Sequence, residues 1–174
     1  MENESNNASL VTEEERAAAA AIYTTLCASL DDVELPYTKA PEDYSVRMKL
    51  QGECLPVGLT ITVEPGRYIV SFISGLPFRV AAERRREAAV AVSIVNSLLT
   101  MGSFDYDFRD GSIMFRMTLN YSDSLISRDA LSYTTFLTCK TVDIFNGNLM
   151  MYTGGAISLD DFRDAAERAV GKRR

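Results

Sequence analysis

The chain contains no histidine among its 174 residues, and this absence excludes more functions than any other feature of the composition. Histidine is the commonest general base, the usual partner of a nucleophilic serine or cysteine, and a frequent metal ligand. The sequence also lacks a G-x-S-x-G elbow, a G-x-G-x-x-G motif after a strand and a Walker phosphate-binding loop. We therefore expect a non-enzymatic protein that uses no cofactor.

Cysteine is scarce and widely spaced, because Cys27, Cys54 and Cys139 form an odd set without a C-x-x-C motif. Neither a disulfide framework nor a zinc knuckle fits this pattern, so free thiols in a reducing compartment are expected. The apolar stretch over residues 17–22 is too short to span a bilayer, and the acidic start at 1–5 is unlike a secretory signal. We therefore expect a soluble, cytoplasmic protein without a membrane partner.

The net charge of −6 and a pI near 4.8 argue against a nucleic-acid partner, which needs basic residues gathered on one face. The two basic clusters, at residues 84–86 and 172–174, lie among acidic neighbours. The length favours one domain with a core of its own. We expect a flexible tail over residues 1–11, a single domain over 12–170 and a basic tail over 171–174.

Helical periodicity predicts helices over residues 12–30 and 82–101, from about residue 127 onward, and again from residue 158. Thr12 and Glu15 have the spacing of a capping box at the start of the first helix. Gly102 stands where a left-handed residue commonly closes a helix. The Asn-Gly-Asn run at 146–148 is expected to end or interrupt the third helix, and Gly154-Gly155 to form a turn before the last.

Alternating apolar and polar residues predict five strands, over residues 44–50, 57–63, 68–73, 104–108 and 113–119. The pairs Pro65-Gly66 and Asp110-Gly111 are typical of tight hairpin turns. With two-residue loops, Val63 would face Tyr68 in the first hairpin and Phe108 would face Ile113 in the second. The second register would also place Asp105 opposite Arg116.

The order of these elements is α-β-β-β-α-β-β-α-α. It predicts a two-layer α+β domain in which helices pack on one face of a five-stranded antiparallel sheet.

Two features leave open a small enzyme or a metal-binding protein. Asp105, Asp107 and Asp110 superficially follow a calcium loop, although the third acid is displaced by one position and Met117 occupies the place of the closing acid. Cys54 lies in a strand connection and is the more accessible candidate nucleophile. The alternating aromatic residues already explain the acidic segment as a strand that enters a turn, which is the favoured interpretation.

The face of the predicted sheet that should meet water carries three apolar residues, Ile69, Ile73 and Met114. Apolar residues on such a face indicate a second packing partner. A flanking helix or the tail of the same chain could cover them. They are otherwise the candidate surface for a homodimer or for a segment of a partner protein.

A series of turns and caps suggests a family. In order along the chain it consists of Leu76-Pro77, Val95-Asn96-Ser97-Leu98-Leu99, Gly102-Ser103-Phe104, Asp110-Gly111, Phe115-Arg116-Met117-Thr118-Leu119 and the segment Gly155–Phe162. Over about residues 68–168 the chain resembles the YbjN-type family of bacterial proteins, which are labelled sensory transduction regulators. The resemblance implies a fold like that of type III secretion chaperones, small acidic proteins that are often dimeric, and it implies no catalytic residues.

Composition, surface and resemblance together predict a chaperone-like or regulatory module that binds a protein of unidentified kind and could form a homodimer. A dedicated chaperone for a secreted effector is an alternative that the sequence leaves open. The enzyme or metal-binding alternative rests on Asp105, Asp107 and Asp110 or on Cys54.

Overall fold

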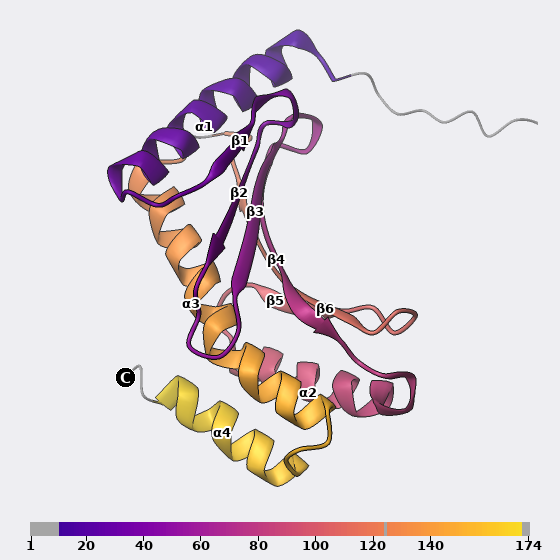
Figure 1. Ribbon diagram of the computed structural model, residues 1–174. Helices are drawn as coiled ribbons and strands as arrows, with labels where there is room; N and C mark the ends of the chain where they lie inside the picture. The colour runs from indigo at the N-terminus through magenta and orange to yellow at the C-terminus, as the bar shows by residue number, and fades with distance from the viewer. Residues whose placement is uncertain (1–10, 124, 172–174) are drawn as a thin grey trace, which may run out of the picture.

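The computed structural model describes residues 11–123 and 125–171 and combines helices with an antiparallel sheet (Figure 1). The helices are α1 (Glu13–Asp32), α2 (Arg85–Leu98), α3 (Arg128–Thr153) and α4 (Leu159–Gly171). The strands are β1 (Thr38–Ala40), β2 (Ser45–Leu50), β3 (Val57–Glu64), β4 (Ile69–Arg79), β5 (Ser103–Tyr106) and β6 (Ser112–Asn120). The tails expected at residues 1–11 and 171–174 fall outside the described residues except for Val11 and Gly171.

The sheet has six strands in the order β1-β2-β3-β4-β6-β5, so the prediction of five strands is wrong by one. The missed strand is β1, whose three residues pair with β2 through Thr38 opposite Arg47 and Ala40 opposite Ser45. None of the three is buried, so β1 shows no apolar alternation. It exists because of main-chain pairing, which leaves no pattern in the side chains.

One face of the sheet forms the core beneath the helices. Figure 1 shows α1 and α3 along this face, with α2 and α4 at the end of the molecule near β5 and β6. The buried apolar side chains on this face include Val46, Met48, Val57, Leu59, Ile61, Val63, Val70, Phe72, Phe104, Ile113, Phe115 and Met117. The α+β architecture with helices packed against an antiparallel sheet is therefore confirmed.

The first predicted hairpin forms, but its register differs from the prediction by two residues. Val63 faces Val70 and not Tyr68, because residues 65–67 make a 3-10 turn and Tyr68 adds a left-handed residue with φ 51°. A shift of two residues leaves every side chain on its own face of the sheet. The inner and outer faces of β3 and β4 are therefore those that the alternation predicted.

The second hairpin has a longer loop than Asp110-Gly111 alone. Tyr106 faces Ile113, and Phe108 lies in the loop with 54% of its surface exposed, so the predicted pair of Phe108 and Ile113 is wrong. Asp105 faces Met114 and not Arg116. The Arg116 Nε still donates to the Asp105 Oδ2 at 2.8 Å, which makes the expected ion pair a diagonal one.

The ends of the first two helices follow from local signals. The Thr12 hydroxyl accepts from the Glu15 amide at 3.2 Å, and the Glu15 carboxylate accepts from the Thr12 amide at 2.7 Å, so the capping box is confirmed. Helix α2 ends at Leu98, earlier than expected, and Gly102 has the left-handed conformation with φ 72° after it. Within the described part of the chain, no helix is both long and apolar enough to cross a membrane.

Helix α3 continues through residues 146–148, so the prediction that this run ends or interrupts it is wrong. Asn146 is fully buried, and Gly147 lies against the connection between β2 and β3. A Cβ atom at Gly147 would lie only 3.0 Å from the Cβ and Sγ atoms of Cys54. Tertiary packing thus requires the residues that would weaken an isolated helix, and packing outweighs propensity here.

A repeated turn precedes β2 and β4. Pro41–Tyr44 and Pro65–Tyr68 share the pattern Pro-x-x-Tyr, and in each the tyrosine is left-handed and its amide donates to the proline carbonyl. The two tyrosine rings pack edge-on against Tyr23 and Tyr121, at centroid distances of 6.1 and 5.6 Å. These contacts hold two bulky residues in a conformation that is costly for non-glycine residues.

Candidate binding surface

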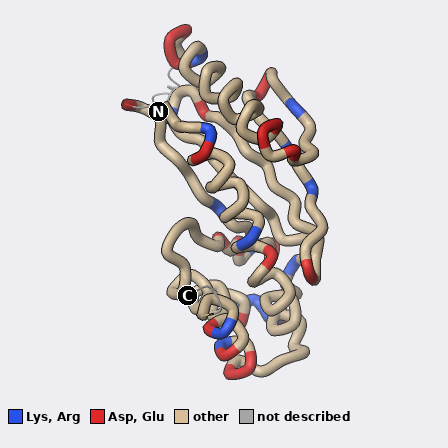
Figure 2. Tube along the Cα trace, turned by 90° about the vertical axis from the view of Figure 1, so that its left-hand side faces the viewer, with Lys and Arg blue, Asp and Glu red and all other residues tan. Residues whose placement is uncertain are grey.

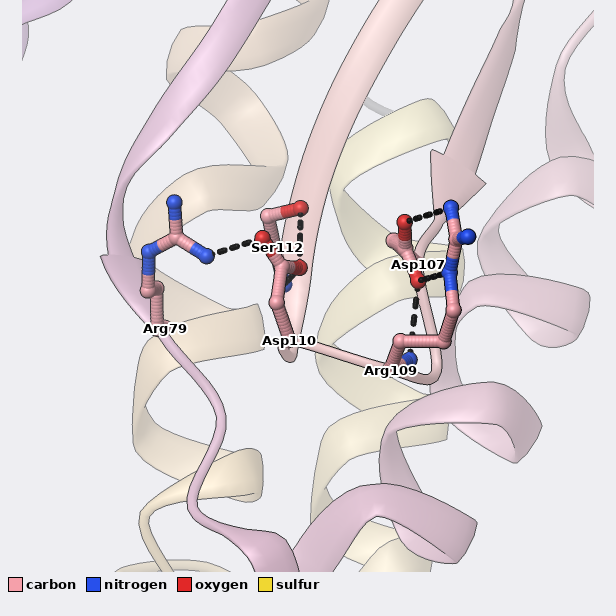
Figure 3. Close-up of polar contacts among 5 residues, drawn as sticks. All are labelled: Arg79, Asp107, Arg109, Asp110 and Ser112. Carbon is pink, nitrogen blue, oxygen red and sulfur yellow. Dashed lines mark hydrogen bonds and ion pairs between the residues drawn. The ribbon is translucent and has the colours of Figure 1, made fainter.

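The acidic hairpin between β5 and β6 does not gather its carboxylates. Figure 3 shows the side chains of Asp107 and Asp110 on opposite sides of the turn. The Arg109 guanidinium donates to Asp107 from Nε at 3.2 Å and from Nη2 at 2.9 Å, and the Arg109 amide donates at 2.8 Å. These bonds, chiefly those from the Arg109 side chain, hold the pKa of Asp107 below its usual value.

Asp110 has a separate set of partners. Its Oδ1 accepts from the Ser112 hydroxyl at 2.7 Å and from the Ser112 amide at 2.9 Å, and its Oδ2 pairs with the Arg79 guanidinium (Figure 3). The Ser112 bonds, with a smaller contribution from Arg79, lower the pKa of Asp110 well below the usual range. Such local side-chain bonds are typical of turn-forming aspartates.

Each carboxylate of the proposed metal loop is thus paired with its own arginine: Asp105 with Arg116, Asp107 with Arg109 and Asp110 with Arg79. Within residues 11–123 and 125–171, no group of three or more carboxylates or thiols could hold a metal ion. These ion pairs stabilise the β5–β6 hairpin and connect it to β4.

Cys54 is exposed, as expected, and lies in the connection between β2 and β3. Next to it the Glu53 amide donates to the Asp143 carboxylate of α3 at 2.8 Å, and Cys54 itself packs over Gly147. These contacts fix the connection on α3.

We predict that the three thiols differ strongly in reactivity. Cys27 is buried, and burial, with the charge of Asp143 as a smaller cause, raises the pKa of Cys139 to about 11. At pH 8 only about one Cys139 in a thousand is then a thiolate, the form that reacts. Ellman's reagent should therefore titrate one thiol rapidly in the native protein and all three in denaturant.

The variant Cys54→Ser should lose the rapid phase and keep the two slow ones. A rapid phase that persists in this variant would contradict the assignment. Raising the pH toward 11 should accelerate the Cys139 reaction, because its thiolate fraction rises through that range.

The outer face of the sheet, which lies opposite the core, carries all three apolar residues singled out in the sequence. Ile73 lies between Thr60 and Arg116 and is 37% exposed, and Met114 lies between Gly75 and Asp105 and is half-buried. Because β4 and β6 are neighbours, Ile73 and Met114 are diagonal to each other and form one apolar patch.

Ile69 does not belong to this patch. It pairs with Glu64 and Asn120, and it lies four residues from Ile73, a distance of about 13 Å along a strand. The buried Ser71 lies between them and donates to the Glu64 carboxylate. The structure therefore brings together two of the three residues.

Two glycines leave the surface beside this patch without side-chain atoms. Gly58 of β3 and Gly75 of β4 belong to the outer face, and a Cβ atom added at either would meet no atom within 4 Å. Glycine within a strand often marks a place where another backbone approaches closely. Gly58 was a polar position of a predicted strand, whereas Gly75 lies two residues beyond the end of another, and their common location depends on the order of the strands.

Positive charge borders the same surface on β2. Arg47 lies opposite Thr60 and Lys49 opposite Gly58, both are exposed, and neither has an ion pair among the residues that the structure describes. The patch formed by Ile73, Met114, Gly58 and Gly75 is called the outer-face patch below. It is apolar at its centre and basic at one border, in a chain whose net charge is −6.

Sequence comparison finds no relatives that would identify the chain. No protein-family model matches it, and the search of the curated proteins found no match.

Comparison with solved structures finds similarity to three of them. The crystal structure of YbjN from E. coli, a candidate transcription regulator, covers 76% of this chain and 91% of its own, with a TM-score of 0.54 at 11% identity. The crystal structure of the ExsC–ExsE complex covers 75% of this chain and 95% of its own, with a TM-score of 0.56 at 11% identity. The HopA1–SchA chaperone–effector complex covers 84% of this chain and 96% of its own, with a TM-score of 0.49 at 14% identity.

The first two similarities confirm the fold that the sequence resemblance implied. The chain has a YbjN-type fold, which is also that of type III secretion chaperones.

Proposed function

We propose that this chain is a chaperone-like or regulatory protein-binding module without catalytic activity, and that the outer-face patch is where the partner protein docks. The observation that carries the proposal is the pair Ile73 and Met114, which form an apolar patch on the face opposite the core. An apolar patch with a polar border is the usual form of a protein-binding site. The fold shared with YbjN and with ExsC in its complex with ExsE supports the same class of function.

The surroundings of the patch favour an extended segment of the partner. The glycines at 58 and 75 let a backbone approach the sheet, while Ile73 and Met114 supply the apolar contact. Arg47 and Lys49, which have no ion pair among the described residues, favour a segment whose apolar residues are flanked by acidic ones. A segment of this kind could belong to a secreted effector or to a cellular target.

Affinity capture from native lysate with matched variants tests the proposal. Ile73→Asp should abolish capture of the partner, because it places a charge in the centre of the patch. Gly75→Arg should do the same by placing a long side chain over the patch, and its Cβ atom would meet no atom within 4 Å. Val90→Asp is the control, since Val90 is an exposed apolar residue of α2 with 46% of its surface accessible.

Mass spectrometry should identify proteins that are captured by the natural chain and by Val90→Asp but lost with the other two variants. An identical set of captured proteins from all four baits would contradict the proposal. A natural chain that is dimeric and becomes monomeric with Ile73→Asp would instead assign the patch to a homodimer.

A further inference from the structure

The solvent face of α3 carries two exposed aromatic residues in its first half. Tyr133 is 60% exposed and Phe136 is 67% exposed, and between residues 130 and 149 no other residue of α3 is exposed. Asp129 and Lys140 flank them at the two ends. The sequence of α3 has no charged residue between Asp129 and Lys140. Figure 2 views the molecule from the left-hand side of Figure 1, the side on which α3 lies.

The four residues lie on one line. Their spacing of four, three and four residues, from Asp129 to Tyr133, Phe136 and Lys140, keeps all of them within about 60° of the helix circumference. This is the spacing of a coiled-coil seam, in which every such position meets a second helix. We call these four residues the α3 seam.

The surface on both sides of the α3 seam is hollowed. A hollow of about 420 Å³ lies between α3 and the ends of α2 and α4, and Tyr133 and Leu137 form part of its wall. A second hollow of about 270 Å³ lies on the other side, against the β2–β3 connection, and includes Phe136 and Lys140. The aromatic ridge and the hollows that could receive such a ridge therefore belong to one surface.

A surface with both a ridge and matching hollows can pair with itself. In a twofold interface the same patch is used by both copies, so it must supply the projections and the cavities together. Large aromatic residues seated in hollows at the centre of an interface contribute most to its stability. The α3 seam meets both conditions.

We propose that α3 packs antiparallel against α3 of a second copy of this chain, with the twofold axis passing between Tyr133 and Phe136. Tyr133 of one copy then faces Phe136 of the other, and the same axis brings Asp129 of each copy opposite Lys140 of the other. Both alignments follow from the residue spacing alone. No second register of the helix pair satisfies both.

The charges also select the direction of pairing. Within the described residues α3 has a single ion pair, between Arg128 and Asp32 at 3.0 Å, whereas Asp129 and Lys140 have none. The antiparallel dimer gives each of them a partner of opposite sign, twice over. A parallel pair would place Asp129 against Asp129 and Lys140 against Lys140, which is unfavourable.

Sedimentation velocity over a protein concentration range of about 1 to 100 μM tests the proposal. The natural chain should dimerise within this range, and Phe136→Asp should raise the dissociation constant at least about tenfold. Phe108→Asp is the matched control, because Phe108 is also an exposed phenylalanine, lies in the β5–β6 hairpin away from α3, and should leave dimerisation unchanged.

Charge reversal gives a readout that a purely structural effect would not produce. Asp129→Lys and Lys140→Asp should each weaken the dimer, because each places like charges opposite one another, and the double variant should restore the natural dissociation constant. Asp129 is exposed and Lys140 is half-buried at the edge of a hollow, outside the core, so all three variants should fold as the natural chain does, with an unchanged far-UV circular dichroism spectrum.

A chain that stays monomeric at the highest concentration would overturn the proposal, as would a dimer that is insensitive to Phe136→Asp. A double variant as weak as the single ones would exclude the antiparallel register. A dimer dissociated by Ile73→Asp and not by Phe136→Asp would place the contact on the outer-face patch. Loss of partner capture with Ile73→Asp and loss of the dimer with Phe136→Asp are separate results, so either proposal can fail alone.

Discussion

Replacing Gly111 with alanine is expected to lower the free energy of unfolding by about 3 kcal/mol. Gly111 has φ 76°, in the left-handed region that costs an alanine about 1 kcal/mol. A Cβ atom there would also collide with the backbone carbonyl oxygen of Val80, and Val80 is itself held by a hydrogen bond from its amide to the Gly111 carbonyl at 2.9 Å. Neither backbone can move without opening the junction of β4 and β6.

The measurement is urea denaturation, with Gly75→Ala as the control. Gly75 also lies in β4, but its φ is not positive and an added Cβ meets no atom within 4 Å. Gly75→Ala should therefore change stability by less than about 1 kcal/mol, and in the stabilising direction. Equal destabilisation by both variants would show that the collision with Val80 does not determine the effect.

The sequence predicted the two faces of the sheet better than it predicted which residues pair. The alternation in β3 and β4 reports only the side on which a residue lies, and a two-residue shift preserves that side. The shift itself arises from Pro65–Tyr68 in the first hairpin and from the Asp107–Gly111 loop in the second. The repeat of Pro-x-x-Tyr at Pro41 and Pro65 was the available signal for the longer first loop.

The remaining differences have causes that lie far away in the chain. Strand β1 forms because it pairs with β2. Helix α3 continues through Asn146–Asn148 because this segment packs against the β2–β3 connection, where Gly147 leaves room for Cys54. A local pattern carries no information about either neighbour.

The same limit applies to the surfaces. Alternation placed Ile73 and Met114 on one face, but only the strand order brings Gly58 and Gly75 beside them. The spacing of the α3 seam is readable in the sequence. That this side of α3 is the exposed one depends on where α1, α2 and the β2–β3 connection pack.

Asn96 also illustrates a role that no local pattern predicts. Its side-chain amide donates to the Phe104 carbonyl at 3.0 Å and accepts from the Phe104 amide at 2.8 Å. Phe104 belongs to β5, the edge strand next to β6, and is 2% exposed. The Asn96 side chain thus takes the place of a neighbouring strand and satisfies both main-chain groups of a buried edge residue.

Asn96→Ala is therefore expected to lower the free energy of unfolding by about 3 kcal/mol, because each unsatisfied buried group costs about 1 to 3 kcal/mol. The neighbouring Ser97→Ala is the control, since Ser97 is exposed and bonds only within its own helix, to the Ile94 carbonyl. It should change stability by less than about 0.5 kcal/mol. Urea denaturation compares the two variants.

Amide hydrogen exchange then locates the effect. In Asn96→Ala the Phe104 amide should lose its protection from exchange, because β5 opens locally. The amides between β3 and β4 should still exchange only by global unfolding, with the protection that the lowered stability of the variant allows. If Phe104 stayed as protected as the centre of the sheet, the loss of stability would have another origin. Protection lost at Phe104 alone would show that a single helix side chain holds the edge of this sheet closed.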